Sequence, residues 1–181
     1  MQEKIDPKSL GRIAVLMGGF GSEREVSLSS GSGVLKALLE AGCDAFAFDP
    51  AEKNLMTLAG CCERAVISLH GRFGEDGCVQ GVLEYLGIPY TGSGVRACAL
   101  SMDKDCTRRV WSQSGISVAD GMIVTSAEEA DAAAAHFKGD VVVKPACEGS
   151  SVGVFKLHGA VPDELRSALS EALKFDKKVL V

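Results

Sequence analysis

A lysine directly follows a short run of β-branched residues in the second half of the chain. Residues 141–143, all valine, are typical of a buried strand, and Lys144 and Pro145 come next. Because proline lacks a backbone N–H, we expect Pro145 to end the hydrogen-bonding ladder of this strand. Lys144 would then place a positive charge where the strand emerges, which suits an anionic ligand.

The loop after this strand is rich in glycine and serine. Gly149 and Gly153 permit unusual backbone angles, and Ser150 and Ser151 between them add hydroxyl donors. Successive amides in such a loop can cradle phosphate oxygens. A glycine-rich hairpin with a surface lysine would have the same pattern, so phosphate binding and a plain hairpin both remain open.

A second glycine-rich segment, residues 18–25, follows the first predicted strand and opens the first predicted helix. A dinucleotide-binding fold has its phosphate turn at this place. Gly19 and Gly21 begin the G-x-G-x-x-G pattern, but Arg24 stands where the third glycine belongs. Asp49, at the end of the second predicted strand, is the one feature that favours a nicotinamide cofactor, because it could accept a hydrogen bond from a ribose.

Glu23 lies at the turn between this loop and the helix. It has a structural interpretation as a helix starter behind an N-cap at Ser22, because a carboxylate there favours the helix dipole. Its functional interpretation is a clamp for an ammonium group, since ligands of parallel sheets gather at this edge.

A third loop, residues 70–77, follows the third predicted strand and should open at the same edge of the sheet. His70 begins it. A lone histidine after a strand is more often structural than catalytic, but glycines on both sides strengthen the case for a ligand loop, so both interpretations stay open. The other two histidines, His136 and His158, have no partner spacing for zinc.

Lys104 lies at the junction between the two halves of the chain. A helix start with a solvated lysine explains residues 101–104 adequately. Together with Lys144, however, Lys104 could bracket a polyphosphate. The chain contains neither the G-x-x-x-x-G-K-[ST] loop nor the G-x-S-x-G elbow of serine hydrolases.

The order of predicted elements divides the chain into two α/β units. In the first, we expect strands at 12–17, 44–48, 64–69 and 89–91 and helices at 23–41 and 77–86. This alternation predicts a doubly wound, Rossmann-like parallel sheet. A helical stretch at 95–113 leads to strands at 120–124, 141–145, 153–156 and 178–181 and helices at 127–137 and 162–174. These predict a second, mixed α/β unit from about Asp103.

Composition and charge limit the partners and the cellular compartment that we expect for this protein. The 181 residues are 46% hydrophobic and 24% charged, and the net charge of -5 argues against a general nucleic-acid binder. The seven cysteines are odd in number and form no C-x-x-C pair, so we expect reduced thiols in a cytoplasmic protein. We also expect neither an export signal at residues 1–8 nor a membrane span.

The motifs together resemble the D-alanine–D-alanine ligase family, whose members have the ATP-grasp fold. The resemblance runs from Gly11 to Val181, in the order of the family. It is carried by Gly18-Gly19, Ser22-Glu-Arg-Glu-Val-Ser-Leu28, Leu69-His-Gly-Arg72, Gly74-Glu-Asp-Gly77, Pro89-Tyr-Thr-Gly-Ser-Gly94, Ala99-Leu-Ser-Met-Asp-Lys104, Val143-Lys-Pro145 and Glu148-Gly-Ser-Ser-Val-Gly153.

The resemblance implies a fold, an activity and partners. Residues 1–102 would be a pre-ATP-grasp substrate domain, and residues 103–181 the first ATP-grasp subdomain. The implied activity is ATP-dependent joining of two D-alanines through a D-alanyl phosphate, for peptidoglycan precursors, with Mg²⁺ bridging the nucleotide phosphates. A homodimer through the N-terminal domain is implied as well.

The resemblance also implies roles for particular residues. Glu23 would hold the ammonium of the first D-alanine, and His70 would line the same pocket. Lys104 and Lys144 would contact the ATP phosphates. A loop would close over them, comprising Glu148, Gly149, Ser150, Ser151 and Val152. Ser150 would support the closed site through a hydrogen bond to Glu23, and the amide near Ser151 would help to stabilise the tetrahedral intermediate.

One departure from the family concerns the C-terminal lobe. Complete ligases continue through an adenine hinge into this lobe, which supplies the magnesium ligands, and we therefore expect those ligands beyond Val181. This predicts a truncated form that is inactive alone. The alternative is a non-catalytic module, derived from the ligase, that binds D-alanine or dimerises.

Overall fold

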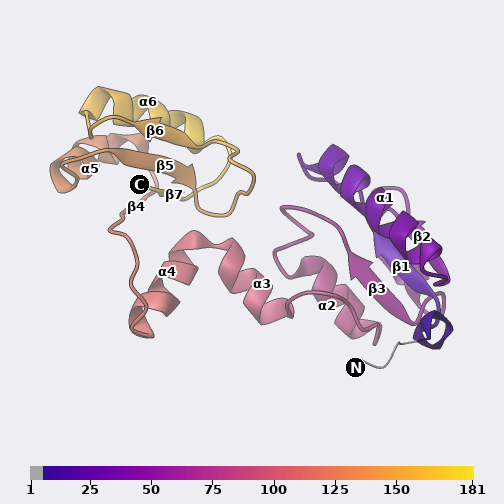
Figure 1. Cartoon of the computed structure of the whole chain (residues 1–181). Helices are drawn as coiled ribbons and strands as arrows, with labels where there is room; N and C mark the ends of the chain where they lie inside the picture. Colours follow the sequence, from indigo (N-terminus) through magenta and orange to yellow (C-terminus); the bar gives the residue numbers. More distant parts are fainter. Residues whose placement is uncertain (1–5) are drawn as a thin grey trace. The chain divides into compact units, whose positions relative to one another are not determined.

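The computed structural model describes residues 6–181, which form two compact units that divide between Ala99 and Leu100 (Figure 1). We expected no export signal at residues 1–8. Residues 1–5 of that segment lie outside the described residues. The α/β fold class expected from the sequence is confirmed: one unit has a parallel sheet and the other an antiparallel sheet.

The first unit is built on a three-stranded parallel sheet. Its order is β2-β1-β3, with Ile13 of the central strand opposite Ala45 on one side and Arg64 on the other. The elements are η1 (Pro7–Leu10), β1 (Ile13–Leu16), α1 (Arg24–Glu40), β2 (Ala45–Phe48), η2 (Leu55–Leu58), β3 (Arg64–Ile67) and α2 (Cys78–Tyr85). The sequence reasoning missed the two short 3-10 helices, which Asp6 and Asn54 cap at their N-termini.

Both faces of this sheet are covered, as a doubly wound fold requires. Ala14 and Leu16 of β1 belong to the same buried cluster as Val79 and Leu83 of α2. Met17, one residue beyond β1, contacts the other helix, since a Cβ at Gly31 of α1 would lie 2.4 Å from the Met17 Cβ. Because side chains alternate along a strand, α1 and α2 pack on opposite faces.

The edge strand expected at residues 89–91 is reduced to one bridge. Tyr90 pairs in parallel with Ala65, which donates to the Pro89 carbonyl at 2.9 Å and accepts from the Thr91 amide at 3.2 Å. The Thr91 side chain takes the next bond, because its Oγ1 accepts from the Ile67 amide at 3.1 Å. The Thr91 hydroxyl thus takes the place of a backbone carbonyl, and the ladder between this segment and β3 ends there.

The helical stretch expected at residues 95–113 is broken. α3 (Val95–Met102) ends before Asp103, and α4 (Lys104–Gln113) begins after it. The Asp103 carboxylate caps α4 by accepting from the amides of Asp105 and Cys106, at 2.9 and 3.1 Å. Asp103 itself has extended backbone angles, so the expected helical stretch consists of two helices, and the second starts within residues 101–104 as the sequence allowed.

The second unit contains a four-stranded sheet in the order β4-β7-β5-β6, with all pairs antiparallel. Its other elements are β4 (Ile123–Val124), η3 (Ala127–Glu129), α5 (Ala130–His136), β5 (Val141–Pro145), β6 (Phe155–Leu157), α6 (Pro162–Ala172) and β7 (Val179–Leu180). The strand expected at residues 178–181 is therefore an interior strand of the sheet.

One face of the second sheet packs on α5 and α6. Val141 and Val143 of β5 form a buried cluster with Ala133 of α5 and with Leu165 and Leu169 of α6. The alternate positions of β5, Val142 and Lys144, therefore lie on the opposite face. This alternation positions the lysine that the sequence singled out.

None of the helices within residues 6–181 combines the length and the apolar character needed to span a bilayer.

Candidate functional site

In the first unit, the structure brings Glu23 to the loop that carries His70. Glu23 is the residue before α1, and its side chain makes no capping hydrogen bond. It lies over Gly71 instead, since a Cβ at Gly71 would be 2.5 Å from Glu23 Oε2. Ser22 is therefore not the N-cap that we expected. The two loops converge at the carboxyl edge of the sheet, as the parallel topology predicts.

His70 is oriented by polar neighbours on two sides. Its Nε2 lies 3.0 Å from Ser30 Oγ of α1, and its Nδ1 lies 3.7 Å from Glu75 Oε1. Ser30 is itself held by a 3.3 Å hydrogen bond from the Ser68 hydroxyl. The side chain of His70 is 31% exposed, so it stays accessible to a small ligand.

A strained residue, which the sequence reasoning missed, shapes the same loop. Phe73 has φ +71°, in the left-handed region that favours glycine. Its amide donates to Asp76 Oδ2 at 2.8 Å, and its ring meets Phe20 edge-on at 5.8 Å between centroids. Burial opposes ionisation of Asp76, but hydrogen bonds from the amides of Phe73 and Cys78 outweigh it and lower its pKa.

The glycine turn after β1 binds a carboxylate of the protein itself, that of Asp49. Asp49 accepts from the Gly19 amide at 3.0 Å and pairs with Arg24 at 2.7 Å. Gly18 has φ +82°, and a Cβ there would overlap the Asp49 carboxylate. The Asp49 carboxylate is thus already bound to the Gly19 amide and to Arg24, at the turn where a dinucleotide phosphate would lie. This argues against the nicotinamide interpretation.

In the second unit, Lys144 faces two adjoining cavities on the open face of the sheet. The first, of about 350 Å³, is lined by Lys104, Lys144, Arg108 and Trp111, among others. The second, of about 400 Å³, is also lined by Lys144 and Arg108, and Phe137 adds an aromatic wall. Arg108 and Trp111 were not foreseen, although both lie on α4 next to the singled-out Lys104.

The loop after β5 connects two antiparallel strands, so the segment is a hairpin in topology. Its positive φ angles fall on Ser150 (+46°), Ser151 (+62°) and Gly153 (+65°). Non-glycine residues adopt such angles at a cost of about 1–3 kcal/mol each, and such strain clusters at functional sites. Gly153 is required by close approach, since a Cβ there would lie 2.7 Å from the Phe175 ring and 2.9 Å from Pro145.

The expectation that Pro145 ends the ladder is only half correct. Pro145 still pairs with Val179 of β7, and the Ala146 amide donates to the Lys178 carbonyl at 2.9 Å. Successive N–H groups of a strand point to opposite neighbours, so the donor that Pro145 lacks would face β6. On that side, the ladder does stop at Val143.

Lys104 is not the solvated lysine of a simple helix start. Its ammonium donates to the carbonyls of Pro145, Ala146 and Glu148, at 3.0, 3.1 and 2.6 Å. Burial, and next the positive charge of Lys144, lower the pKa of Lys104.

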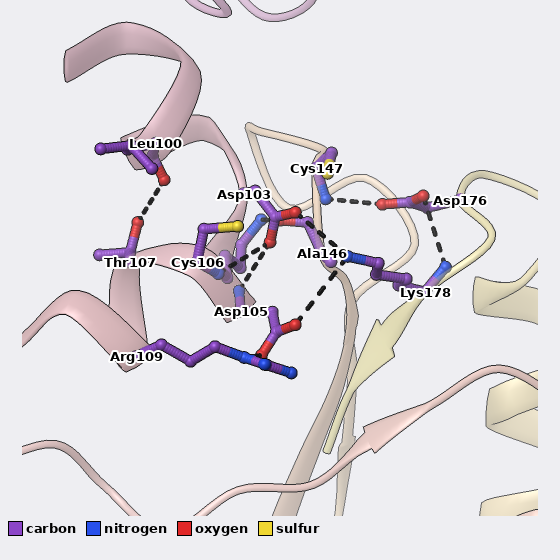
Figure 2. A network of polar contacts seen from close by, with 11 residues as sticks. Leu100, Asp103, Asp105, Cys106, Thr107, Arg109, Ala146, Cys147, Asp176 and Lys178 are labelled. Carbon is purple, nitrogen blue, oxygen red and sulfur yellow. Dashed lines mark hydrogen bonds and ion pairs between the residues drawn. The ribbon is translucent and has the colours of Figure 1, made fainter. Parts of the chain in front are cut away.

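A polar network surrounds the place where the loop leaves β5 (Figure 2). Lys178 reaches Asp103 at 3.4 Å, and Asp176 Oδ2 accepts from the Cys147 amide at 2.7 Å. Burial and the charge of Asp176 raise the pKa of the Cys147 thiol to about 11. Sequence reasoning overlooked Asp176 and Lys178, because charged residues in a turn carry no motif.

The remaining residues that we expected at the nucleotide site lie in the β5–β6 loop. They do not line the two cavities, and their roles stay predictions: Glu148, Gly149, Ser150, Ser151 and Val152. Glu23 and Ser150 lie in different units, so the hydrogen bond expected between them also stays a prediction.

Two family models match the chain. One, described as the D-ala D-ala ligase N-terminus, matches residues 48–93, and the other, described as the D-ala D-ala ligase C-terminus, matches residues 110–181. The chain belongs to the D-alanine–D-alanine ligase family. The expected resemblance is thereby confirmed.

Individual relatives agree with the family models. A D-alanine–D-alanine ligase of Delftia acidovorans is 51% identical over 178 residues, which are 98% of this chain and 54% of that protein. The crystal structure of a Bacillus anthracis D-alanine–D-alanine ligase has a TM-score of 0.81 and 36% identity, covering 93% of this chain and 56% of the other. A Bacillus anthracis structure complexed with ATP has a TM-score of 0.77 and 32% identity, covering 94% and 57%. The chain spans about half the length of the curated relatives that it matches.

Proposed function

We propose that this chain carries nucleotide-binding and D-alanine-binding elements of an ATP-dependent D-alanine–D-alanine ligase acting in peptidoglycan synthesis. The observation that carries the proposal is the pair of cavities around Lys144. They combine the cationic side chains of Lys144 and Arg108 with apolar walls from Trp111 and Phe137. A nucleotide needs both features, since its base is flat and apolar and its phosphates are anionic.

The β5–β6 loop would complete the phosphate site. Turns with left-handed residues, as at Ser150 and Ser151, can form concavities of backbone amides that bind anions. We assign the loop to nucleotide binding through Glu148, Gly149, Ser150, Ser151 and Val152, and to intermediate stabilisation through the amide near Ser151.

The first unit would bind the first D-alanine. The carboxylate of Glu23 would pair with the substrate ammonium, and His70, held by Ser30, would line the same pocket. Phosphoryl transfer from ATP to the D-alanine carboxylate would give D-alanyl phosphate and ADP. Attack by the amine of a second D-alanine would then expel phosphate and form the peptide bond. Positioning and charge neutralisation supply most of the catalysis in such a transfer.

The described residues do not fit a magnesium site held by the protein. Among residues 6–181, no group of three or more histidine, cysteine, aspartate and glutamate side chains could hold a metal ion. No step of the proposal is therefore assigned to a metal bound by these residues.

Trp111 provides a direct test of nucleotide binding, because it lines the cavity and is the only tryptophan of the chain. We expect its fluorescence to change saturably when ATP is added. Lys144→Met should weaken the apparent affinity about tenfold, through loss of a charged hydrogen bond to phosphate. The control Lys156→Met, at an exposed position of β6 outside both cavities, should leave it unchanged. A flat fluorescence signal up to millimolar ATP would refute the nucleotide proposal.

A non-catalytic D-alanine-binding or dimerising module is the alternative, and exposed apolar side chains in the first unit favour it. Phe20 and Val26 are 68% and 59% exposed, beside the loop that carries Glu23. A homodimer through the N-terminal domain would cover such side chains. A concentration-independent monomer in sedimentation velocity would count against the dimer.

A further inference from the structure

Ser27 of α1 is a fully buried polar residue whose hydroxyl joins two segments of backbone. Its Oγ accepts from the Gly18 amide at 2.9 Å and donates to the Ser68 carbonyl at 2.7 Å. Gly18 lies in the turn after β1, and Ser68 is the residue that follows β3. A buried hydroxyl is tolerated only when it is hydrogen-bonded, and this one is bonded as both donor and acceptor.

The Ser27 hydroxyl occupies a place that belongs to the backbone ladder between β1 and β3. These strands are parallel, and the Ser68 amide donates to the Leu16 carbonyl at 2.9 Å. In a parallel ladder, the next bond would run from the Gly18 amide to the Ser68 carbonyl. Instead, the Ser27 hydroxyl stands between these two groups and bonds both of them. The carboxyl ends of β1 and β3 are therefore held apart by one hydroxyl group.

The two segments that Ser27 holds apart lead to the residues of the proposed D-alanine site. The turn after β1 ends at Glu23, and Ser68 lies two residues before His70. The Ser68 hydroxyl donates to Ser30 Oγ at 3.3 Å, which in turn lies 3.0 Å from His70 Nε2. Ser27 thus lies behind the site, where its position affects both of the loops that form it.

The other side of β1 also ends with side chains in place of backbone groups. Pro50 follows β2 closely and has no amide for a further ladder bond. The Asp49 carboxylate accepts from the Gly19 amide at 3.0 Å, and Arg24 donates to the Gly19 carbonyl at 2.9 Å. Asp49 and Arg24 bind only the turn after β1, whereas Ser27 binds that turn and the end of β3.

We propose that Ser27 is a positioning residue of the D-alanine site, whose inserted hydroxyl sets the spacing between the loops that carry Glu23 and His70. This inference rests on the proposed function of the first unit. Ser27 is fully buried, so it acts through the two loops and not by contact with the ligand. A small ligand held from two loops needs them placed within about 0.5 Å. Without the hydroxyl, the Gly18 amide and the Ser68 carbonyl lose their partner or close onto each other, and both loops shift.

Amide NMR signals of the ligand-free chain test whether Ser27 spaces the two loops. Ser27→Ala should shift the signals of residues 18–23 and of residues 68–72. Asp49→Asn should shift the first set and leave the second in place, because its contacts lie on the other side of β1. Ser29→Ala is the matched control, since Ser29 is an exposed serine of the same helix, and it should shift neither set. Changes in Ser27→Ala that are confined to residues 18–23 would overturn the proposal.

Titration of the same signals with D-alanine tests the consequence for binding. Ser27→Ala should weaken D-alanine about tenfold, since small displacements of binding groups are costly. Ser27→Cys keeps a weaker donor and acceptor, so its loss should be smaller. This variant also keeps the test decisive where Ser27→Ala does not fold. An unchanged D-alanine affinity in a folded Ser27 variant whose loop signals have shifted would refute the positioning role.

Ile88→Val separates positioning from stability. It trims the same buried cluster outside residues 18–27 and 68–77, so it should lower stability and leave D-alanine affinity unchanged. An affinity loss in Ile88→Val equal to that in Ser27→Ala would mean that stability alone is measured, and the positioning role would fall. If the unmodified chain binds no D-alanine, the proposed function of the first unit fails, and the ligand-free signals still decide whether Ser27 spaces the two loops.

Discussion

Individual charged side chains in this protein are used to hold backbone groups in place. Asp49 fixes the turn after β1 through the Gly19 amide, Asp103 caps α4, and Lys104 binds three carbonyls. In each case, a formal charge is matched to backbone N–H or C=O dipoles, which fixes a turn, a helix end or the start of a loop. Residues that look like ligand-binding groups in the sequence can thus be structural.

Asp49 gives a prediction about acid stability. Burial opposes its ionisation, but hydrogen bonds from Arg24, Gly19 and Ala51 outweigh burial and lower its pKa. A lowered carboxyl pKa stabilises the fold above the unfolded value of 3.8, and this contribution is lost as pH falls through the lower, folded value.

We expect Asp49→Asn to lower the free energy of unfolding by about 2 kcal/mol at neutral pH, through the loss of charged hydrogen bonds. The deficit should start to shrink below about pH 4, because the unfolded chain then takes up a proton at Asp49 that the folded chain, with its lowered pKa, does not yet bind. Urea unfolding at pH 7 and pH 3 measures both values. An equal deficit at the two pH values would show that the charge of Asp49 contributes nothing.

Among the elements, α1 shows how one helix is fitted to its sheet. It contains two glycines, and only one of them meets a neighbour. A Cβ at Gly31 would lie 2.4 Å from the Met17 Cβ, whereas nothing lies within 4 Å of a Cβ at Gly33. Gly31 is therefore a packing requirement, and Gly33 merely lowers the helix propensity.

The two glycines form a matched pair of substitutions. Gly31→Ala should destabilise the chain by about 1–3 kcal/mol, because the added methyl forces α1 away from the sheet. Gly33→Ala should stabilise it by about 0.5–1 kcal/mol, because alanine favours the helix. Thermal unfolding of both variants measures the difference. Equal effects of the two changes would mean that α1 does not pack on Met17 as described.

The molecule as a whole consists of two units, each with its own buried cluster and its own candidate site. Glu23 and His70 belong to the first unit, and Lys104 and Lys144 belong to the second. A ligand of one site should therefore be recognised by the elements of its own unit.

Hydrogen exchange across the chain tests this division. D-alanine should slow exchange at residues 18–25 and 70–77, through its ammonium at Glu23, and ATP should slow exchange at residues 146–154. L-alanine is the matched control for D-alanine, since it differs only in the direction of its methyl group. Equal protection by both alanines, or protection by D-alanine only outside the first unit, would contradict the assignment of Glu23 and His70.

The sequence by itself determined the α/β class, the two units, the order of nearly all strands and the family. These follow from local patterns: the β-branched run at residues 141–143, the glycines after β1 and the chain order of the motifs. Local patterns suffice because strand and helix periodicity, and glycine in turns, depend on neighbouring residues.

Only the tertiary structure decided which charges are already paired. Asp49 and Arg24 are 25 residues apart in the chain and Lys104 and Glu148 are 44 apart, yet each pair is joined by a hydrogen bond or ion pair. The break at Asp103, the single bridge at Tyr90 and the strained Phe73 likewise depend on partners outside their own segments. Long-range polar pairing has no periodicity, because a charge is satisfied by whichever group the fold brings within about 3 Å. The three carbonyls that accept from Lys104 are therefore visible only in three dimensions.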